Sequence, residues 1–375
     1  MQEPVQFLVS DANVPFPATG HRYRASAFVD WPTDATFEIA VGSADRDPIS
    51  QAVRSQAYAP PPSFRVMFTL MTPGCTVLDL GANIGTFSLA AASLGCRVIS
   101  VEASPHNVAL LEASVLRNRF TQMQVVHAAI SDHIGELEFS ENGPWGFIVN
   151  SVIARPGITV QALTVDALLA QLGCEHVDLV KMDIEGSEVA AVRGMSGLLS
   201  GSKSPPVFYE SNGHTLRLFN ETPDTLRTSI QRFGYQSYIV EPGRLVPIGP
   251  TDLQAECFVD YLAVKQMPVG LRQFRRETAL SREEIVLKIL GESVNPNPDQ
   301  RANLCRALAA KRDSLSDERV LNAMLSLLDD PDPEVRAAAE WIRQLRPART
   351  RGAFARVFHD LLSLLSSGPS GSKRP

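Results

Sequence analysis

The middle of the chain alternates short apolar runs, each the length of a strand, with longer stretches in which apolar residues recur at helical spacing. The strand-like runs are TVLDLG from Thr76, RVISVE from Arg97, MQVVHAAI from Met123, VDLVKMDI from Val177 and PVFYES from Pro206. The helical stretches between them are SLAAASLG, HNVALLEASVLRNR, TVDALLAQLG and EVAAVRGMSGLLS. This alternation predicts a doubly wound α/β fold, a parallel sheet with helices on both faces, which ends in an antiparallel pair at YQSYIV and CFVDYLAV.

The pattern changes on either side of this core. Residues 1–60 mix β-prone runs with Pro, Asp and Gly, which predicts an irregular β-rich segment that closes at the proline run YAPPPSF. From residue 269 the sequence is rich in Leu, Ala, Arg and Glu and has no strand pattern, which predicts an α-helical module over 269–365 and a disordered tail over 366–375. The α/β domain is therefore assigned to residues 61–268.

Two stretches of the helical module, NPDQRANLCRAL and DPEVRAAAEWIRQL, can be overlaid at a spacing of 35 residues. The overlay matches Pro298 with Pro333 and Arg301 with Arg336. It indicates either two HEAT-like helix pairs or a chance similarity between alanine-rich helices. In the first case, the helices would offer a surface for a protein partner.

Composition and charge exclude several classes of protein. The 375 residues are 44% hydrophobic and 20% charged, which excludes wholesale disorder, and no apolar run reaches the roughly 18 residues of a membrane span. The first residues, MQEPVQFLVSDANVPF, lack the pattern of a secretory signal, so we expect a cytoplasmic protein. A net charge of -6 without a dense Lys/Arg stripe argues against a nucleic-acid substrate. The scattered cysteines fit neither a disulfide framework nor a zinc site.

The first predicted strand runs into a glycine-containing loop, VLDLGANIGTF, and then into a helix. Glycines there let the backbone approach a nucleotide-like ligand, and the helix N-terminus offers free N–H donors. Asp79, Gly81 and Gly85 follow the spacing D-x-G-x-x-x-G, with Asn83 between the glycines. A dinucleotide fingerprint would need a glycine in place of Asn83 and another in place of Thr86, so the loop argues against NAD.

Two further acids are candidates for the same ligand. Glu102 ends the next strand, 23 residues after Asp79, close to the offset at which a carboxylate accepts from both hydroxyls of a ribose. The alternative is a strand-end surface acid or a helix cap. Asp132 follows the third strand, where either Asp132 or the backbone near Ala129 would read an adenine amino group. The alternative for Asp132 is a turn residue.

The segment VDLVKMDIEGSE gathers charges at the end of a buried strand, where ligands of open α/β sheets bind. Its Glu188 fits a first-turn helix acid and its Lys181 fits an ion pair with a neighbouring carboxylate. Asp183 and Glu185 are left as functional candidates. The candidate base is a carboxylate such as Asp183, or else His214.

Glu210 ends the fifth strand and His214 follows on the next loop. If this strand neighbours the fourth, Glu210 and His214 share one pocket with Asp183 and Glu185. His214 is a candidate general base or a solvated loop histidine. Asp183, Glu185 and Glu210 also form a candidate site for a divalent cation, because magnesium and calcium prefer oxygen ligands.

Together these motifs resemble the FkbM family of methyltransferases. The similar segments are VLDLGANIGTFSL, VEASP, AAISDHIGELEF, LTVDALL, VDLVKMDIEGSEVAAVRGMSGLL and PVFYES, which fall between about residues 72 and 264. The resemblance implies a class I methyltransferase fold, S-adenosylmethionine as the cofactor, and O-methylation of a hydroxyl on a sugar or polyketide-type small molecule. It also implies cofactor contacts from Gly81, Asn83, Gly85 and Glu102, with Asp183 and Glu185 facing the methyl group or the acceptor.

The competing interpretation is a non-catalytic scaffold, in which a degenerate methyltransferase domain positions the helical module for a protein partner. The intact glycines and Glu102 argue against degeneration.

Overall fold

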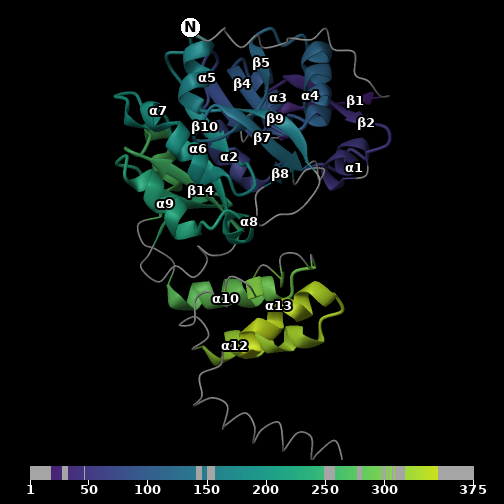
Figure 1. Cartoon of the computed structure of the whole chain (residues 1–375), viewed down its shortest axis with the longest axis vertical. Coiled ribbons are helices and arrows are strands. Elements are labelled where there is room, and N and C mark those ends of the chain that lie inside the picture. Colours follow the sequence, from purple (N-terminus) through teal and green to yellow (C-terminus); the bar gives the residue numbers. More distant parts are fainter. Residues whose placement is uncertain are drawn as a thin grey trace, which may run out of the picture. The chain divides into compact units, whose positions relative to one another are not determined.

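The computed structural model describes residues 18–27, 33–45, 47–140, 146–149, 157–248, 258–276, 281–296 and 317–344, together with 298, 301, 302, 304, 305 and 308 (Figure 1). The chain divides into two compact units, Met1–Arg282 and Glu283–Pro375. The predicted disordered tail lies outside the described residues. Within the described residues, no helix has both the length and the apolar character that crossing a bilayer requires.

An eight-stranded sheet forms the centre of the first unit. Its strands, in spatial order, are β13 (Arg244–Pro247), β12 (Gln236–Glu241), β14 (Phe258–Val264), β11 (Val207–Asn212), β10 (Leu179–Met182), β3 (Thr76–Leu80), β4 (Arg97–Glu102) and β5 (Met123–His127). The five from β11 to β5 run parallel, whereas β14 pairs antiparallel with both β11 and β12. This order confirms the doubly wound prediction and its antiparallel end.

The strand order reverses direction between β3 and β10. Connections through β3, β4 and β5 progress one way across the sheet, and those through β10 and β11 progress the other way. Because parallel crossovers are right-handed, the two sets of helices cover opposite faces. The reversal opens a crevice at the carboxyl ends of β3 and β10, which is where such sheets bind ligands.

Several helices of this unit begin at a residue that caps the helix N-terminus. Ser104, Thr164 and Thr222 cap three of them by accepting a hydrogen bond from a backbone N–H of the first turn. The predicted stretch from Glu188 breaks into two helices, and α1, α2, α8 and α9 were not predicted. The helices are α1 (Pro48–Arg54), α2 (Pro62–Thr69), α3 (Thr86–Ser93), α4 (Pro105–Asn118), α5 (Val165–Gln171), α6 (Glu188–Gly194), α7 (Ser196–Ser200), α8 (Gly213–Leu218) and α9 (Pro223–Gln231).

A second, four-stranded sheet was not predicted. Its order is β6 (Ala129–Ile130), β9 (Ile158–Leu163), β7 (Gly135–Ser140) and β8 (Phe147–Ile148). The predicted strand from Met123 is divided between the sheets, because β5 pairs with β4 whereas β6 pairs with β9.

The N-terminal segment contains the β structure that its sequence predicts. β1 (Ala18–Arg24) and β2 (Thr36–Gly42) form an antiparallel pair that lies beside α4 (Figure 1). The side chain of Asn118, at the end of α4, accepts from the Glu38 N–H and donates to the Glu38 carbonyl, both at 2.7 Å. These bonds occupy backbone groups of β2, so the segment is part of the same compact unit as the sheet.

Most of the described residues of the second unit are helical. Its helices include α10 (Arg282–Ser293), α12 (Glu318–Ser326) and α13 (Pro333–Gln344). The guanidinium of Arg301 donates to both carboxylate oxygens of Asp330, and Arg336 donates to the Asp330 carbonyl. Both arginines that the repeat overlay matches thus bind the same residue. The HEAT-like repeat itself stays a prediction, since part of its first copy lies outside the described residues.

Candidate functional site

A cavity of about 320 Å³ lies at the carboxyl ends of the central strands. Its walls come from the loop after β3, the ends of β4, β10 and β11, and one residue of β14. Ile49 and Tyr58 of the N-terminal segment also line it. The volume is in the range of small-molecule binding sites, and the place is the crevice that the strand order predicts.

The loop between β3 and α3 contains three residues with positive φ. Gly81, Asn83 and Gly85 have φ values of 79°, 52° and 87°. A Cβ on Gly81 would lie 1.9 Å from the carbonyl oxygen of Asp183, so Gly81 lets the ends of β3 and β10 approach each other. A Cβ on Gly85 would meet Leu111 of α4 at 2.2 Å. Gly81 and Asn83 line the cavity, whereas Gly85 serves the packing of α3 on α4.

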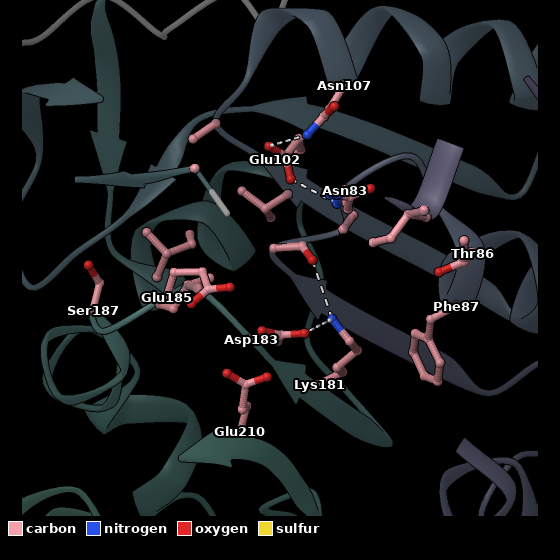
Figure 2. Close-up of a pocket in the computed structure, with 18 of the residues that line it drawn as sticks. Asn83, Thr86, Phe87, Glu102, Asn107, Lys181, Asp183, Glu185, Ser187 and Glu210 are labelled. Atoms are coloured by element: carbon pink, nitrogen blue, oxygen red, sulfur yellow. Dashed lines mark hydrogen bonds and ion pairs between the residues drawn. The ribbon is translucent and has the colours of Figure 1, made fainter. Parts of the chain in front are cut away.

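Glu102 lies at one end of the cavity with its carboxylate fixed by backbone donors (Figure 2). Its Oε2 accepts from the Asn83 N–H and its Oε1 from the Ser104 N–H, both at 2.8 Å. The Asn107 amide donates to Oε1 at 3.5 Å. Burial raises the pKa of Glu102, while these donors favour the ionised form. The carboxylate is therefore held in one orientation, with acceptor positions left for a ligand.

Asp79 lies beneath the cavity and does not line it. Its side chain is fully buried, accepts from the Ser88 hydroxyl at 2.6 Å, and accepts from the Lys181 ammonium at 3.1 Å. Lys181 also lies 3.6 Å from a carboxylate oxygen of Asp183. Burial opposes the charge on Lys181, but the attraction of Asp79 and Asp183 raises its pKa above the ordinary value. The ion pair that the sequence offered as an alternative for Lys181 is thus present.

The other end of the cavity gathers carboxylates, as Figure 2 shows for Asp183, Glu185 and Glu210. One oxygen from each lies within 4.8 Å of the other two. Burial, followed by repulsion from Asp183, raises the pKa of Glu185 to about 8 and that of Glu210 well above its ordinary value. These three residues therefore meet as the sequence predicts.

A fourth acid, Asp260 of β14, was not predicted. It pairs in register with Glu210 of β11, so both side chains leave the sheet on the same face. Burial raises the pKa of Asp260 to about 6, and a hydrogen bond with Ser63 works in the opposite direction. The signal in the sequence was a charged residue within the otherwise apolar run FVDYLAV.

Residues 79–237 match the family model described as the methyltransferase FkbM domain. The chain carries an FkbM methyltransferase domain. This confirms the resemblance for residues 79–237, which form an S-adenosylmethionine-dependent methyltransferase domain with a class I fold. The FkbM domain spans Glu102, Asp183, Glu185 and Glu210, whereas Asp260 lies beyond the matched segment.

Several solved methyltransferases are similar to this chain at low identity. A TehB-like SAM-dependent methyltransferase from Corynebacterium glutamicum is 12% identical, with a TM-score of 0.34 over 58% of this chain and 94% of its own. The Bacillus cereus O-methyltransferase in complex with SAH is 12% identical, with a TM-score of 0.32 over 59% and 91%. The T. thermophilus 16S rRNA methyltransferase RsmC is 14% identical, with a TM-score of 0.34 over 66% and 51%. No curated protein matches the sequence.

Four predicted site residues do not line the cavity: Asp79 and Gly85, described above, and also Asp132 and His214. Asp132 lies between β6 and β7 with 39% of its side chain exposed, and it pairs with His133 at 3.0 Å and with Arg193 at 3.7 Å. His214 lies in the first turn of α8, where its N–H donates to the Asn212 side chain. We therefore carry neither Asp132 nor His214 into the proposed site.

The sequence also gave no reason to single out Tyr58, which lines the cavity of the FkbM domain from the N-terminal segment. Its hydroxyl forms a hydrogen bond with Thr86, and burial raises its pKa. Tyr58 stands at the start of YAPPPSF, and α2 begins within that run. The proline run thus brings an aromatic side chain and α2 to the cavity, which spacing alone does not reveal.

Proposed function

We propose that this methyltransferase transfers the methyl group to a hydroxyl of a sugar or polyketide-type small molecule, and that the cavity is the site of transfer. The proposal rests on one observation: the two ends of the same cavity carry carboxylates in different environments. Glu102 offers oriented acceptors at one end, and Asp183, Glu185 and Glu210 offer proton acceptors at the other.

The Glu102 end fits the nucleoside part of S-adenosylmethionine. A carboxylate held by backbone N–H groups can accept from both hydroxyls of a ribose. Gly81 and Asn83 line the adjoining wall, and the missing side chain of Gly81 lets the nucleoside approach the backbone closely. Ala129 and Ile130 line the wall beside Glu102, and we assign the adenine to their backbone in place of Asp132.

The acidic end fits the acceptor hydroxyl. S-adenosylmethionine supplies the methyl group: the acceptor oxygen bonds to the methyl carbon as the carbon–sulfur bond breaks, and the electron pair stays on sulfur. The protein must align the acceptor and remove its proton. Asp183 is the proposed base, because Lys181 at 3.6 Å keeps a positive charge beside its carboxylate. Glu185, with a pKa of about 8, is the second candidate.

The test is release of S-adenosylhomocysteine from S-adenosylmethionine with a panel of sugars and glycosylated polyketides. Asp183→Asn is expected to lower turnover about 100-fold or more, since a positioned base contributes on that order. Its affinity for S-adenosylhomocysteine, measured by calorimetry, is expected to stay within about threefold, because hydrogen bonds to the ribose and adenine are unaffected. The matched control is Asp34→Asn, at an exposed position outside the cavity.

Unchanged turnover in Asp183→Asn would remove Asp183 from the role of base. Absence of S-adenosylhomocysteine binding by the full chain, even at high micromolar concentration, would instead support the non-catalytic scaffold.

A further inference from the structure

The acidic end of the cavity has the spacing of a cation site. Two ligands on opposite sides of a cation lie about 4–5 Å apart, twice the metal–oxygen distance of magnesium or calcium. The carboxylate oxygens of Asp183, Glu185 and Glu210 lie within 4.8 Å of one another. This spacing brings all three carboxylates within reach of one ion.

Glu210 supplies an independent sign that this end of the cavity binds a ligand. Only 7% of its surface is exposed, and its Oε1 has no hydrogen-bond partner among the described residues. The carboxylate faces Asp183 across the cavity (Figure 2). A buried carboxyl oxygen without a partner is costly, so the site favours a proton or a cation at this point.

The described residues around the cavity do not supply that positive charge. Among the described residues that line the cavity, Lys181 is the one Lys, Arg or His, and its ammonium lies closer to Asp79 than to Asp183, at 3.1 Å against 3.6 Å. Asp260, directly opposite Glu210 on the neighbouring strand, adds a further carboxyl to the same face. The negative charge of the cluster thus exceeds the positive charge around it.

We propose that Asp183, Glu185 and Glu210 bind a divalent cation that prefers oxygen ligands, such as Mg²⁺, Mn²⁺ or Ca²⁺. Carboxylates without thiolate or imidazole ligands are the set expected for these ions. The site rests on the geometry of the cluster, and only its use at the acceptor end rests on the proposed function. There, a cation would stabilise negative charge on the acceptor oxygen and would favour acceptors with two neighbouring oxygens, such as a sugar diol.

The experiment is titration of the chelator-treated full chain with MnCl₂, in which electron paramagnetic resonance measures the free ion. We expect about one bound Mn²⁺ per chain, displaced by excess Mg²⁺ or Ca²⁺, because the three ions share oxygen ligands. Glu210→Gln should weaken Mn²⁺ binding by about tenfold or more, because it removes one charged ligand but keeps the side-chain size.

Asp183→Asn provides a second variant if Glu210→Gln does not fold, as judged by circular dichroism. Glu175→Gln, an exposed glutamate outside the cavity, is the matched control and should bind Mn²⁺ as the unchanged chain does. No Mn²⁺ bound at about 1 mM, the weak limit of protein calcium sites, would overturn the cation site. Unchanged binding in a folded Glu210→Gln or Asp183→Asn variant would also overturn it.

Calorimetry with S-adenosylhomocysteine on the same samples separates this inference from the proposed function. A chain that binds S-adenosylhomocysteine but not Mn²⁺ has a cofactor site and no cation site. A chain that binds neither fails both proposals.

Discussion

Buried carboxylates lie at both ends of the cavity, but their surroundings differ. At one end, each oxygen of Glu102 accepts from a backbone N–H, which comes from Asn83 or Ser104. At the other end, Asp183, Glu185 and Glu210 face one another, and an oxygen of Glu210 has no partner among the described residues. The same chemical group is thus oriented by the backbone at one end and crowded by like charges at the other.

The difference indicates what each end binds. A carboxylate whose orientation is fixed by donors is prepared for a neutral polar ligand such as a diol, since the desolvation cost is already offset. A cluster of carboxylates without enough counter-charge needs a proton or a cation from outside. The first end therefore fits the nucleoside of the methyl donor, and the second fits an acceptor together with its proton or a cation.

The ends are joined where Gly81 meets the backbone of Asp183. Gly81→Ala should be the most damaging change, because its Cβ would lie 1.9 Å from the Asp183 carbonyl oxygen and its φ of 79° disfavours any side chain. We expect a loss of about 4 kcal/mol or more in the free energy of unfolding, measured with urea.

Gly74→Ala is the control for this change. Gly74 has a φ of 85°, but no atom lies within 4 Å of its added Cβ. This variant should lose only about 1–2 kcal/mol in the free energy of unfolding, which is the cost of a side chain in the left-handed conformation. Equal losses in the two variants would contradict a close approach between β3 and β10.

Glu102→Ala should separate the two ends by function. Loss of two hydrogen bonds from the ribose to a charged acceptor should weaken S-adenosylhomocysteine binding by about 100-fold or more. Mn²⁺ binding should be unchanged, because Glu102 is not part of the acidic cluster. Calorimetry and paramagnetic resonance measure the two affinities, and an S-adenosylhomocysteine affinity that stays within about threefold would argue against the ribose contact.

Glu188 combines both kinds of environment in one side chain. Its Oε1 accepts from the backbone of Ile184 and Gly186, whereas its Oε2 has no partner among the described residues. Burial raises its pKa from 4.5 to about 7. A raised folded pKa contributes stability that is present below about pH 4.5 and is lost as the pH rises to about 7.

Glu188→Gln removes this dependence and keeps the accepting oxygen. At pH 8 the variant should be about 2–3 kcal/mol more stable to urea than the unchanged chain, with little difference at pH 4.5. A variant that is less stable at both pH values would show that the ionised carboxylate stabilises the loop.

The smallest effect is expected from Asp132→Asn. Because Asp132 is partly exposed and does not line the cavity, its removal should leave S-adenosylhomocysteine affinity within about twofold. A tenfold loss in calorimetry would return Asp132 to the cofactor site.

The sequence predicted those strands whose apolar residues are also buried in the structure. β3 and β4 begin at the predicted Thr76 and Arg97, and their ends place Gly81 and Glu102 at the cavity. These strands are central and buried, so their short apolar runs predict strands and nothing else. The acids after β10 and β11 were predicted to meet because neighbouring parallel strands end at the same edge.

The rest depended on pairing between distant segments. The run from Met123 is apolar throughout, and no residue pattern shows that β6 pairs with β9, some 30 residues further along. Likewise, Asp260 reaches the cluster because β14 inserts between β11 and β12. Asp79 belongs to the glycine-loop motif, but the structure directs its carboxylate to Lys181 and Ser88. Sequence spacing predicts the backbone of the loop, but not the direction of each side chain.

We propose that one cavity holds the methyl donor at Glu102 and presents its reactive end to the acids after β10. A crystal structure of the full chain with S-adenosylhomocysteine would show both contacts at once. We expect the ribose hydroxyls within hydrogen-bond distance of the Glu102 carboxylate and the sulfur on the side of Asp183. Binding of the nucleoside away from Glu102, or a sulfur directed away from Asp183, would contradict it.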